Sequence, residues 1–217
     1  ISDTGMLTIN DDDATTLTIA DVSVAENGGP AVITLTSDKA VAGGFTVDVS
    51  TSDGSATTAD GDYTAVSSQT VTFTGNAGES QTVNITLGAD SKLENDETLT
   101  VSMSNSSKSA LTTITDTATV TITNDDSATL TISDNTTAEN SGPSVVTLSV
   151  DNAVQGGFWV TVQRADGTAT VADSDYTAGT DNVTFSGNAG ETKTVSIPLG
   201  SDTKLEANET LTLSLGS

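Results

Sequence analysis

Residues 43–49 read Gly-Gly-Phe-Thr-Val-Asp-Val, and residues 156–162, lying 113 positions later, read Gly-Gly-Phe-Trp-Val-Thr-Val. In both stretches Phe and Val recur at every second position, which is the period of a β-strand with one buried face. The recurrence indicates a strand that belongs to a repeated module. These two stretches therefore predict a tandem of β domains.

Four further blocks return in the same order. Ala25-Glu26-Asn27 recurs at 138–140 and Asp62-Tyr63-Thr64 at 175–177, each displaced by 113 positions. The block 73–79, Phe-Thr-Gly-Asn-Ala-Gly-Glu, returns with one change at 185–191, and Lys92-Leu93-Glu94 returns at 204–206, both displaced by 112. A period of this size fits a complete β-sandwich of about 100 residues better than a short solenoid unit.

The limits of the copies follow from the block Val-Thr-Ile-Thr-Asn-Asp-Asp at 120–126, which closes the first copy. It resembles Met-Leu-Thr-Ile-Asn-Asp-Asp at 6–12. We therefore predict three segments. Residues 1–13 are the last strand of a preceding repeat, 14–126 are a complete repeat, and 127–217 are a second repeat that lacks its final strand.

Alternation with a period of two runs through each copy, and short polar segments rich in Gly, Asn, Asp and Ser interrupt it. In the first copy the apolar positions are Phe45, Val47 and Val49; Val83, Ile85 and Leu87; Leu99, Val101 and Met103; and Ala118, Val120 and Ile122. Thr occupies many positions between them. We predict an all-β fold: tandem immunoglobulin-like antiparallel β-sandwiches of about seven strands each, without helices.

The excess of acidic residues limits the kinds of molecule that the chain could bind. Thirty acidic residues against six basic ones give a formal net charge of −24, which repels nucleic acid and anionic membrane surfaces and favours cations. Cys and His are absent, which excludes disulfides, zinc sites built on those residues and Ser-His-Asp catalysis. No apolar run approaches the roughly 20 residues of a membrane span, so no membrane insertion is predicted.

Many of the carboxylates lie in the turns between strands, at equivalent positions in both copies. In the first copy they are Glu26, Asp60, Asp62, Asp90, Glu94, Glu97, Asp125 and Asp126, and in the second Glu139, Asp173, Asp175, Asp202, Glu206 and Glu209. Several turns that supply oxygen ligands to one end of a sandwich would satisfy the six to eight ligands of calcium. The alternative is that acidic turn residues form turns and keep the surface soluble.

The blocks Ala-Glu-Asn at 25–27, Asp53–Thr64, 73–79, Leu93–Val101 and Asn-Asp-Asp at 124–126 together resemble the Calx-beta domain. That family occurs in sodium/calcium exchangers, in an integrin β subunit and, as tandem runs, in large bacterial surface and secreted proteins. The resemblance implies calcium at one end of each sandwich, next to the following domain. The implied ligands are Glu26, Asp62, Asp90, the Lys92 carbonyl, Glu94, Glu97, Asp125 and Asp126, then Glu139, Asp175, Asp202, Glu206 and Glu209.

One departure from the exchanger pattern concerns the loop before the Leu-Glu block. The exchanger loop is richer in Asp, whereas this chain has only Asp90 and Asp202 at the corresponding places. We therefore expect that this chain binds fewer calcium ions, or binds them more weakly. Glu94 and Glu97 could also be considered as the acid and base of a glycosidase, but aromatic residues make up only 3% of the chain and the pair recurs in both copies, which argues against an active site.

We predict a non-enzymatic, calcium-rigidified spacer of a large extracellular or cell-surface protein that serves adhesion or matrix assembly. Its partners would be calcium, the neighbouring repeats, and a surface polysaccharide or protein receptor. Two alternatives stay open: an accessory module of a secreted polysaccharide-degrading enzyme, and a regulatory calcium sensor. Trp159, the one Trp, is expected on the outer face of its strand, where it either packs against a neighbour or contacts a ligand.

Overall fold

The structure is a computed structural model that describes residues 2–216. The chain forms two compact units: one comprises Ile1–Asp90 and Asp96–Asp125, the other Ser91–Asn95 and Asp126–Ser217. Ile1 and Ser217, the outermost residues of the predicted segments, lie outside the described residues. The repeat limits drawn from the sequence stay a prediction.

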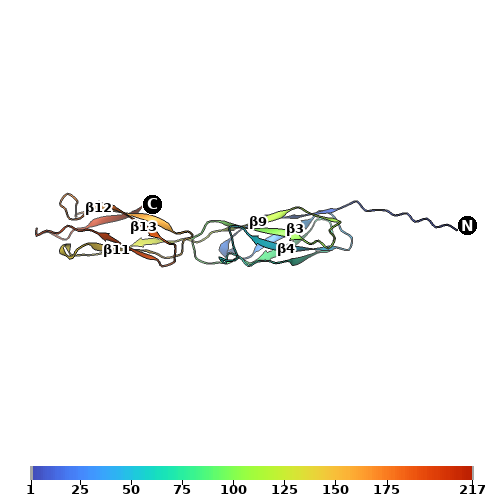
Figure 1. Cartoon of the computed structure of the whole chain (residues 1–217), viewed down its shortest axis with the longest axis horizontal. Helices are drawn as coiled ribbons and strands as arrows, with labels where there is room; N and C mark the ends of the chain where they lie inside the picture. The colour runs from blue at the N-terminus through green and yellow to red at the C-terminus, as the bar shows by residue number, and fades with distance from the viewer. Residues whose placement is uncertain (1, 217) are drawn as a thin grey trace. The chain divides into compact units, whose positions relative to one another are not determined.

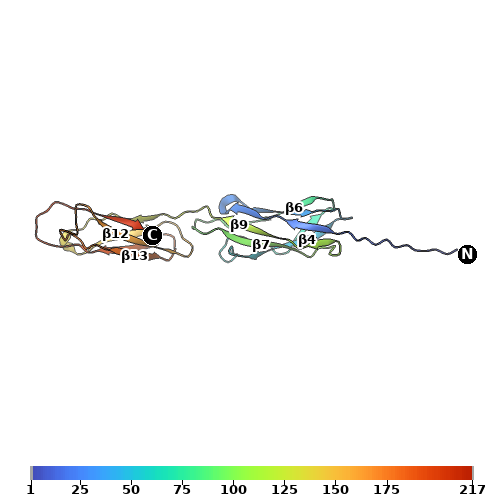
Figure 2. The same cartoon turned by 90° about the horizontal axis from the view of Figure 1, so that it is seen from above.

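The first unit is a sandwich of a four-stranded sheet, in the order β6-β3-β1-β8, and a five-stranded sheet, in the order β2-β9-β7-β4-β5. In Figure 2, β6 of the first sheet and β7 of the second lie on opposite sides of this sandwich. The strands are β1 (Thr15–Ile19), β2 (Val22–Ala25), β3 (Ala31–Ser37), β4 (Phe45–Asp53), β5 (Gln69–Phe73), β6 (Glu79–Ile85), β7 (Glu97–Ser104), β8 (Thr112–Ile114) and β9 (Thr117–Thr123).

The second unit contains two three-stranded sheets, in the orders β10-β11-β14 and β13-β12-β15. Figure 1 labels β11, β12 and β13 of this unit. The strands are β10 (Leu130–Ile132), β11 (Ser144–Val150), β12 (Phe158–Asp166), β13 (Thr180–Phe185), β14 (Thr192–Ile197) and β15 (Leu211–Gly216). The predicted fold class, a tandem of all-β sandwiches, is confirmed.

Two details differ from a purely antiparallel sandwich without helices. The pairs β1·β8 and β2·β9 are parallel, because β1 and β2 form one extended segment that changes sheets at 20–21 and runs in the same direction as its partner in each sheet. Two short 3-10 turns are also present, η1 (Glu26–Gly28) and η2 (Glu139–Ser141). Each of them carries one of the candidate metal ligands.

The residues at the predicted apolar positions form the hydrophobic core. Along β4, Phe45, Val47 and Val49 are at most 4% exposed, while Thr46 and Asp48 between them are half-buried. Val83, Leu99 and Val120 on other strands are buried in the same way. Burial of such side chains stabilises the fold by about 1.5–3 kcal/mol each, so the sandwich depends on Val, Ile, Leu and Phe. Trp159, as expected, lies on an outer face and is 56% exposed.

The repeated Gly-Gly-Phe block has a steric cause. Gly44 has φ of +64°, and a Cβ there would lie 2.4 Å from the carbonyl oxygen of Phe73 on the neighbouring strand. Gly75 has φ of +100°, and its Cβ would lie 2.1 Å from the carbonyl oxygen of Val41. Only glycine fits both positions. The tight corner stacks the rings of Phe45 and Phe73 at a centroid distance of 4.8 Å.

The block 73–79 is closed by Glu79, whose carboxylate ties the turn to β6. It accepts hydrogen bonds from the backbone N–H of Thr74 at 2.8 Å and of Gly75 at 2.9 Å, and from the Thr74 hydroxyl at 2.9 Å. The hydrogen bond from the Thr74 backbone, joined by those from the Gln81 side chain and the Thr74 hydroxyl, lowers the pKa of Glu79 from 4.5 to about 2. Glu191 closes the equivalent turn in the second unit.

We expect Glu79→Gln to lower the melting temperature of the first sandwich at pH 7. Because the folded-state pKa of Glu79 lies below its ordinary value of 4.5, the stabilisation is complete above pH 4.5 and disappears as the pH falls towards about 2. The difference between wild type and variant should therefore shrink across that window. Circular dichroism melts from pH 7 to pH 2 measure this, with the exposed Asp134→Asn as control. A difference that is constant with pH would contradict it.

Residues 2–14 form no strand, and within residues 2–216 no strand pairs with them. The described side chains of Met6, Leu7 and Ile9 are 87–95% exposed. The prediction that this segment is a closing strand of another repeat is not tested by the structure, because a strand requires a neighbouring strand.

Candidate metal centre

The first carboxylate group joins Asp62, Glu94 and Glu97, each of which offers an oxygen within 4.8 Å of the others. Asp62 lies in the loop after β4, Glu97 is the first residue of β7, and Glu94 lies three residues before it. Glu97 is only 9% exposed. A cation bound by these three carboxylates would offset the repulsion between their charges.

The loop of Asp62 is held by hydrogen bonds within the block Asp53–Thr64. The backbone N–H of Thr57 donates to Oδ2 of Asp62 at 2.6 Å, which fixes that carboxylate. The hydroxyl of Tyr63 donates to Oδ1 of Asp53 at 2.6 Å and closes the base of the loop. Burial, followed by this hydrogen bond, raises the pKa of Tyr63 from 10.0 to about 12, so the hydroxyl stays a donor.

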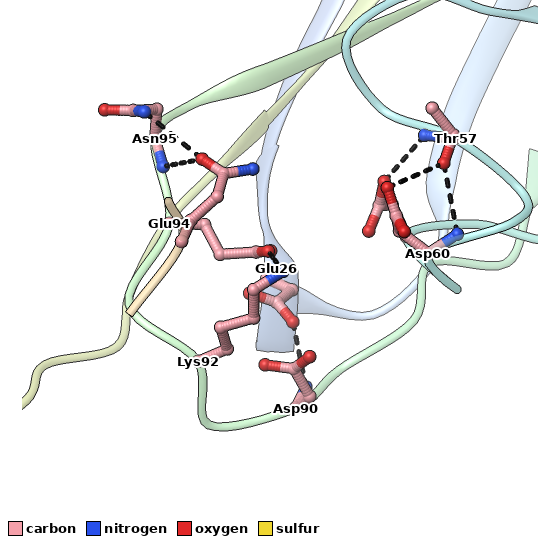
Figure 3. Close-up of polar contacts among 9 residues, drawn as sticks. Glu26, Thr57, Asp60, Asp90, Lys92, Glu94 and Asn95 are labelled. Atoms are coloured by element: carbon pink, nitrogen blue, oxygen red, sulfur yellow. Dashed lines mark hydrogen bonds and ion pairs between the residues drawn. The ribbon is translucent and has the colours of Figure 1, made fainter. Parts of the chain in front are cut away.

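A second group joins Glu26, Asp125 and Asp126 with the same spacing limit of 4.8 Å. Glu26 begins the turn η1 and is 7% exposed. Its Oε1 accepts the backbone N–H of Asp90 at 2.8 Å, as Figure 3 shows, so the loop after β6 is tied to this turn. Asn27 donates its side-chain N–H to Oδ1 of Asp125 at 3.0 Å.

Lysine side chains accompany the Glu of each Leu-Glu block. The ammonium of Lys92 forms an ion pair with the Glu94 carboxylate, and the two side chains meet in Figure 3. Lys204 and Glu206 form the same pair in the second repeat, and this contact raises the pKa of Lys204. Each ammonium would therefore compete with a cation for one carboxylate.

The second repeat groups Asp175, Glu206 and Glu209, which are the equivalents of the first group, within 4.8 Å. The backbone N–H of Thr170 donates to Oδ2 of Asp175 at 2.7 Å, as Thr57 does to Asp62. Desolvation, followed by the negative charges of Asp175 and Glu206, raises the pKa of Glu209. Three carboxylates repel one another here, and a bound cation would relieve that repulsion.

Other predicted ligands lie beside these groups rather than in them. Within the described residues, Asp90, Asp202 and Glu139 belong to no group of three carboxylates. The backbone carbonyl of Lys92 stays a predicted ligand. Asp202 donates its backbone N–H to Oε1 of Glu139 at 2.6 Å, the same contact that joins Asp90 and Glu26. Asp60 accepts the Thr57 hydroxyl at 3.1 Å and so helps to form the loop.

Sequence reasoning missed the residues that position the carboxylates. Thr57 and Thr170 act through backbone N–H groups, which carry no side-chain signature, while Asn27 could have been found from its recurrence as Asn140 in the repeated Ala-Glu-Asn block. Asp11, Asp12 and Asp13 also form a group of three, but they are consecutive and fully exposed.

Among residues 2–216, the groups of three consist of carboxylate oxygens alone. Such donor sets suit the hard cations calcium and magnesium, and the flexible, many-ligand arrangement from several loops favours calcium. The chain is thus a tandem of β-sandwich domains in which loop carboxylates gather in groups that could hold a divalent cation.

The chain belongs to the Calx-beta domain family, whose model matches residues 9–126 and again 123–217. The resemblance drawn from the sequence is thus confirmed, and so is the tandem arrangement. Domains of this family are binding modules, and they bind calcium, which agrees with the predicted cofactor.

Two solved structures illustrate the likeness. The crystal structure of CBD12 from CALX1.2 is 20% identical, with 93% of this chain and 79% of that chain covered and a TM-score of 0.45. The apo form of the Calx CBD1 domain is 21% identical, with 52% of this chain and 100% of that chain covered and a TM-score of 0.46. No curated protein matches the sequence significantly. Among residues 2–216, no helix is long and apolar enough to cross a membrane.

Proposed function

We propose that this chain is a calcium-rigidified spacer, part of a large extracellular or cell-surface protein that serves adhesion or matrix assembly. Calcium would bind in the first repeat to Asp62, Glu94 and Glu97, and to Glu26, Asp125 and Asp126. In the second repeat it would bind to Asp175, Glu206 and Glu209. The chain acts as a binding and structural module and not as an enzyme.

One observation carries the calcium part of this proposal. The triad of Asp62, Glu94 and Glu97 is gathered in the first repeat, and its equivalents Asp175, Glu206 and Glu209 are gathered in the second. The two triads come from loops with different sequences, Asn95-Asp96 in one and 207–208 in the other. Acidic side chains that only keep the surface soluble need not gather at one point of the domain.

The hydrogen bonds of each loop prepare the site. The backbone N–H of Thr57 fixes one oxygen of Asp62, and the backbone N–H of Asp90 fixes one oxygen of Glu26. Such fixed ligands lower the entropy lost on binding. Calcium must displace Lys92 from Glu94 or share that carboxylate with it, so a moderate affinity is expected.

The stiffening part of the proposal rests on chain connectivity. Asp125 and Asp126 end the first repeat and lead directly into the second, with Ser127 next. An ion held by Glu26 and this Asp pair would fasten the connecting segment to the turn η1 of the first sandwich. Without the ion, the gathered carboxylates repel and the connecting segment gains freedom.

An extracellular place for the protein agrees with the strongly acidic composition, which suits an environment rich in calcium. A net charge of −24 favours solubility and attracts cations to the chain. Calcium at about 1 mM outside cells would fill half or more of the sites whose dissociation constants are about 10⁻⁴–10⁻³ M.

Small-angle X-ray scattering of the 217-residue chain tests the spacer role. In calcium we expect a larger and better defined maximum dimension, and in chelator a broader distribution of distances. The double variant with Asp125→Asn and Asp126→Asn should show, even in calcium, the broad distribution of distances expected for wild type in chelator. The exposed Asp134→Asn should behave as wild type. Indistinguishable profiles in calcium and in chelator would refute the stiffening.

A further inference from the structure

Asp53 and Tyr63 enclose the loop that carries Asp62, yet among residues 2–216 Asp53 belongs to no group of three carboxylates. Tyr63 is 4% exposed, and its hydroxyl donates to Oδ1 of Asp53 at 2.6 Å. The same oxygen accepts the backbone N–H of Thr58 at 3.1 Å. One carboxylate at the end of β4 therefore holds both the middle and the far end of this loop.

The near side of the loop is bound to β7 beside the candidate ligand Glu97. Ala56 donates its backbone N–H to the carbonyl of Thr98 at 2.9 Å, and the backbone N–H of Thr98 donates to the Ser55 hydroxyl at 2.8 Å. A Cβ on Gly54 would lie 2.3 Å from the Thr98 carbonyl oxygen, so this close approach requires glycine. Because Thr98 directly follows Glu97, the loop starts from a fixed place next to that ligand.

The far side of the loop fixes the backbone of Asp62. The carbonyl of Asp62 accepts the backbone N–H of Gly88 at 2.9 Å, and the N–H of Asp62 donates to the carbonyl of Thr57 at 3.2 Å. A Cβ on Gly88 would lie 1.8 Å from the carbonyl oxygen of Gly61, so these two segments also meet closely. Tyr63 is the next residue in the chain, and a displacement of Tyr63 would therefore move Asp62.

We propose that Asp53 and Tyr63 are positioning residues of the metal site in the first repeat. Their hydrogen bond spans the loop and sets where Asp62 lies relative to Glu97. Without it, Asp62 would leave that position more often, and a bound cation would have to restore the position at a cost in affinity. The effect on calcium rests on the proposed function, whereas the effect on the loop rests on the hydrogen bonds alone.

The second repeat contains the same pair. The hydroxyl of Tyr176 donates to Oδ1 of Asp166 at 2.6 Å, and the backbone N–H of Val171 donates to the same oxygen at 3.1 Å. The hydrogen bond from Tyr176, followed by that from Val171, lowers the pKa of Asp166, so this carboxylate stays an acceptor at neutral pH. Val171 replaces Thr58, and both donate through the backbone, so the change of side chain leaves the arrangement intact.

Tyr63→Phe separates the hydrogen bond from the packing of the ring, because it keeps the buried ring and removes only the hydroxyl. In chelator the backbone amides of Thr57 and Thr58, which donate to the two Asp carboxylates, should exchange at least about tenfold faster than in the native chain. Hydrogen exchange of the whole chain, followed by NMR, measures these rates. Amides along β3, inside the four-stranded sheet, should change much less.

Thr15→Val is the matched control. It removes another hydroxyl that donates to an Asp carboxylate in the same sandwich, here Oδ1 of Asp38 at 2.8 Å. Thr15 is 2% exposed, so its hydroxyl, like that of Tyr63, belongs to a buried side chain. The control should leave the exchange of the Thr57 and Thr58 amides at the native rate.

Calcium titration tests the effect on the site. The background carries Glu206→Gln and Glu209→Gln, which remove two carboxylates of the second triad, so that the heat reports the first repeat. In this background Tyr63→Phe should weaken calcium binding by about 10–100-fold, the usual effect of removing a residue that orients a metal ligand. Thr15→Val should leave the affinity unchanged.

The two measurements separate the inference from the proposed function. Unchanged exchange of the Thr57 and Thr58 amides in Tyr63→Phe, or an equal rise along β3, would overturn the positioning role. Faster exchange at these two amides with unchanged calcium affinity would overturn the role at the metal site. A background chain that binds no calcium would contradict the proposed function and, with it, the calcium part of this inference. The exchange rates would then still decide whether the pair holds the loop.

Discussion

Calcium at about one hundred times its dissociation constant is expected to raise the melting temperature of the first sandwich by on the order of 10 °C over chelator. Binding to the folded state alone adds about 2.7 kcal/mol per site at that concentration. For a domain of this size each kcal/mol shifts the melting temperature by about 4 °C or more. The buried carboxylates of Glu26 and Glu97 make the first repeat the more responsive one.

Differential scanning calorimetry in calcium, magnesium and chelator measures this effect. Magnesium should stabilise much less, because it requires near-ideal octahedral ligands and these loops offer an irregular set. Glu97→Gln should remove most of the calcium response, while Asp134→Asn, an exposed change outside the groups, should retain it. A melting temperature that does not respond to calcium would contradict the binding of calcium in the first repeat.

Phe73→Ala is expected to destabilise the first sandwich by about 3–5 kcal/mol. Phe73 is 1% exposed and stacks on Phe45 at a centroid distance of 4.8 Å, with an interplanar angle of 5°. The corner glycines around the pair hold the backbone close, so the surrounding residues cannot collapse into the space left by the ring. Part of the loss is the stacking itself, about 0.5–1.5 kcal/mol.

Urea unfolding followed by circular dichroism measures this destabilisation. Thr72→Ala, one residue away on the same strand and exposed, is the matched control and should change stability by less than about 1 kcal/mol. The second sandwich has its own core around Leu148 and Phe185, so its transition should stay in place. An equal loss in both variants would show that the Phe stack does not hold the core.

The fold class could be predicted from the sequence because apolar and polar residues alternate along each strand, and this alternation indicates which face of the strand is buried. Phe45, Val47 and Val49 alternate with polar residues, and their burial matched the pattern. The change of sheet between β1 and β2 could not be predicted, because Thr15–Ile19 and Val22–Ala25 both alternate and nothing in the sequence separates their sheets. The pairing order of strands depends on contacts distant in sequence.

The candidate site was predicted in part, because repetition picked out the acidic positions. Asp62, Glu94 and Glu97 do gather in space. Asp90 was predicted as a metal ligand. In the structure its backbone N–H donates a hydrogen bond to the Glu26 carboxylate. The ion pair between Lys92 and Glu94 could not be foreseen either, since side-chain orientation in a loop depends on the folded backbone.

Calorimetric titration of calcium into the 217-residue chain, and into the variant with Glu94→Gln and Glu97→Gln, tests the central claim most directly. The account predicts saturable binding to the native chain, with the tighter component lost in the variant. Removing a residue that only orients a metal ligand costs a site about 10–100-fold in affinity, so removing two ligand charges should cost more. Identical isotherms for the two proteins, or no binding heat in either, would contradict it.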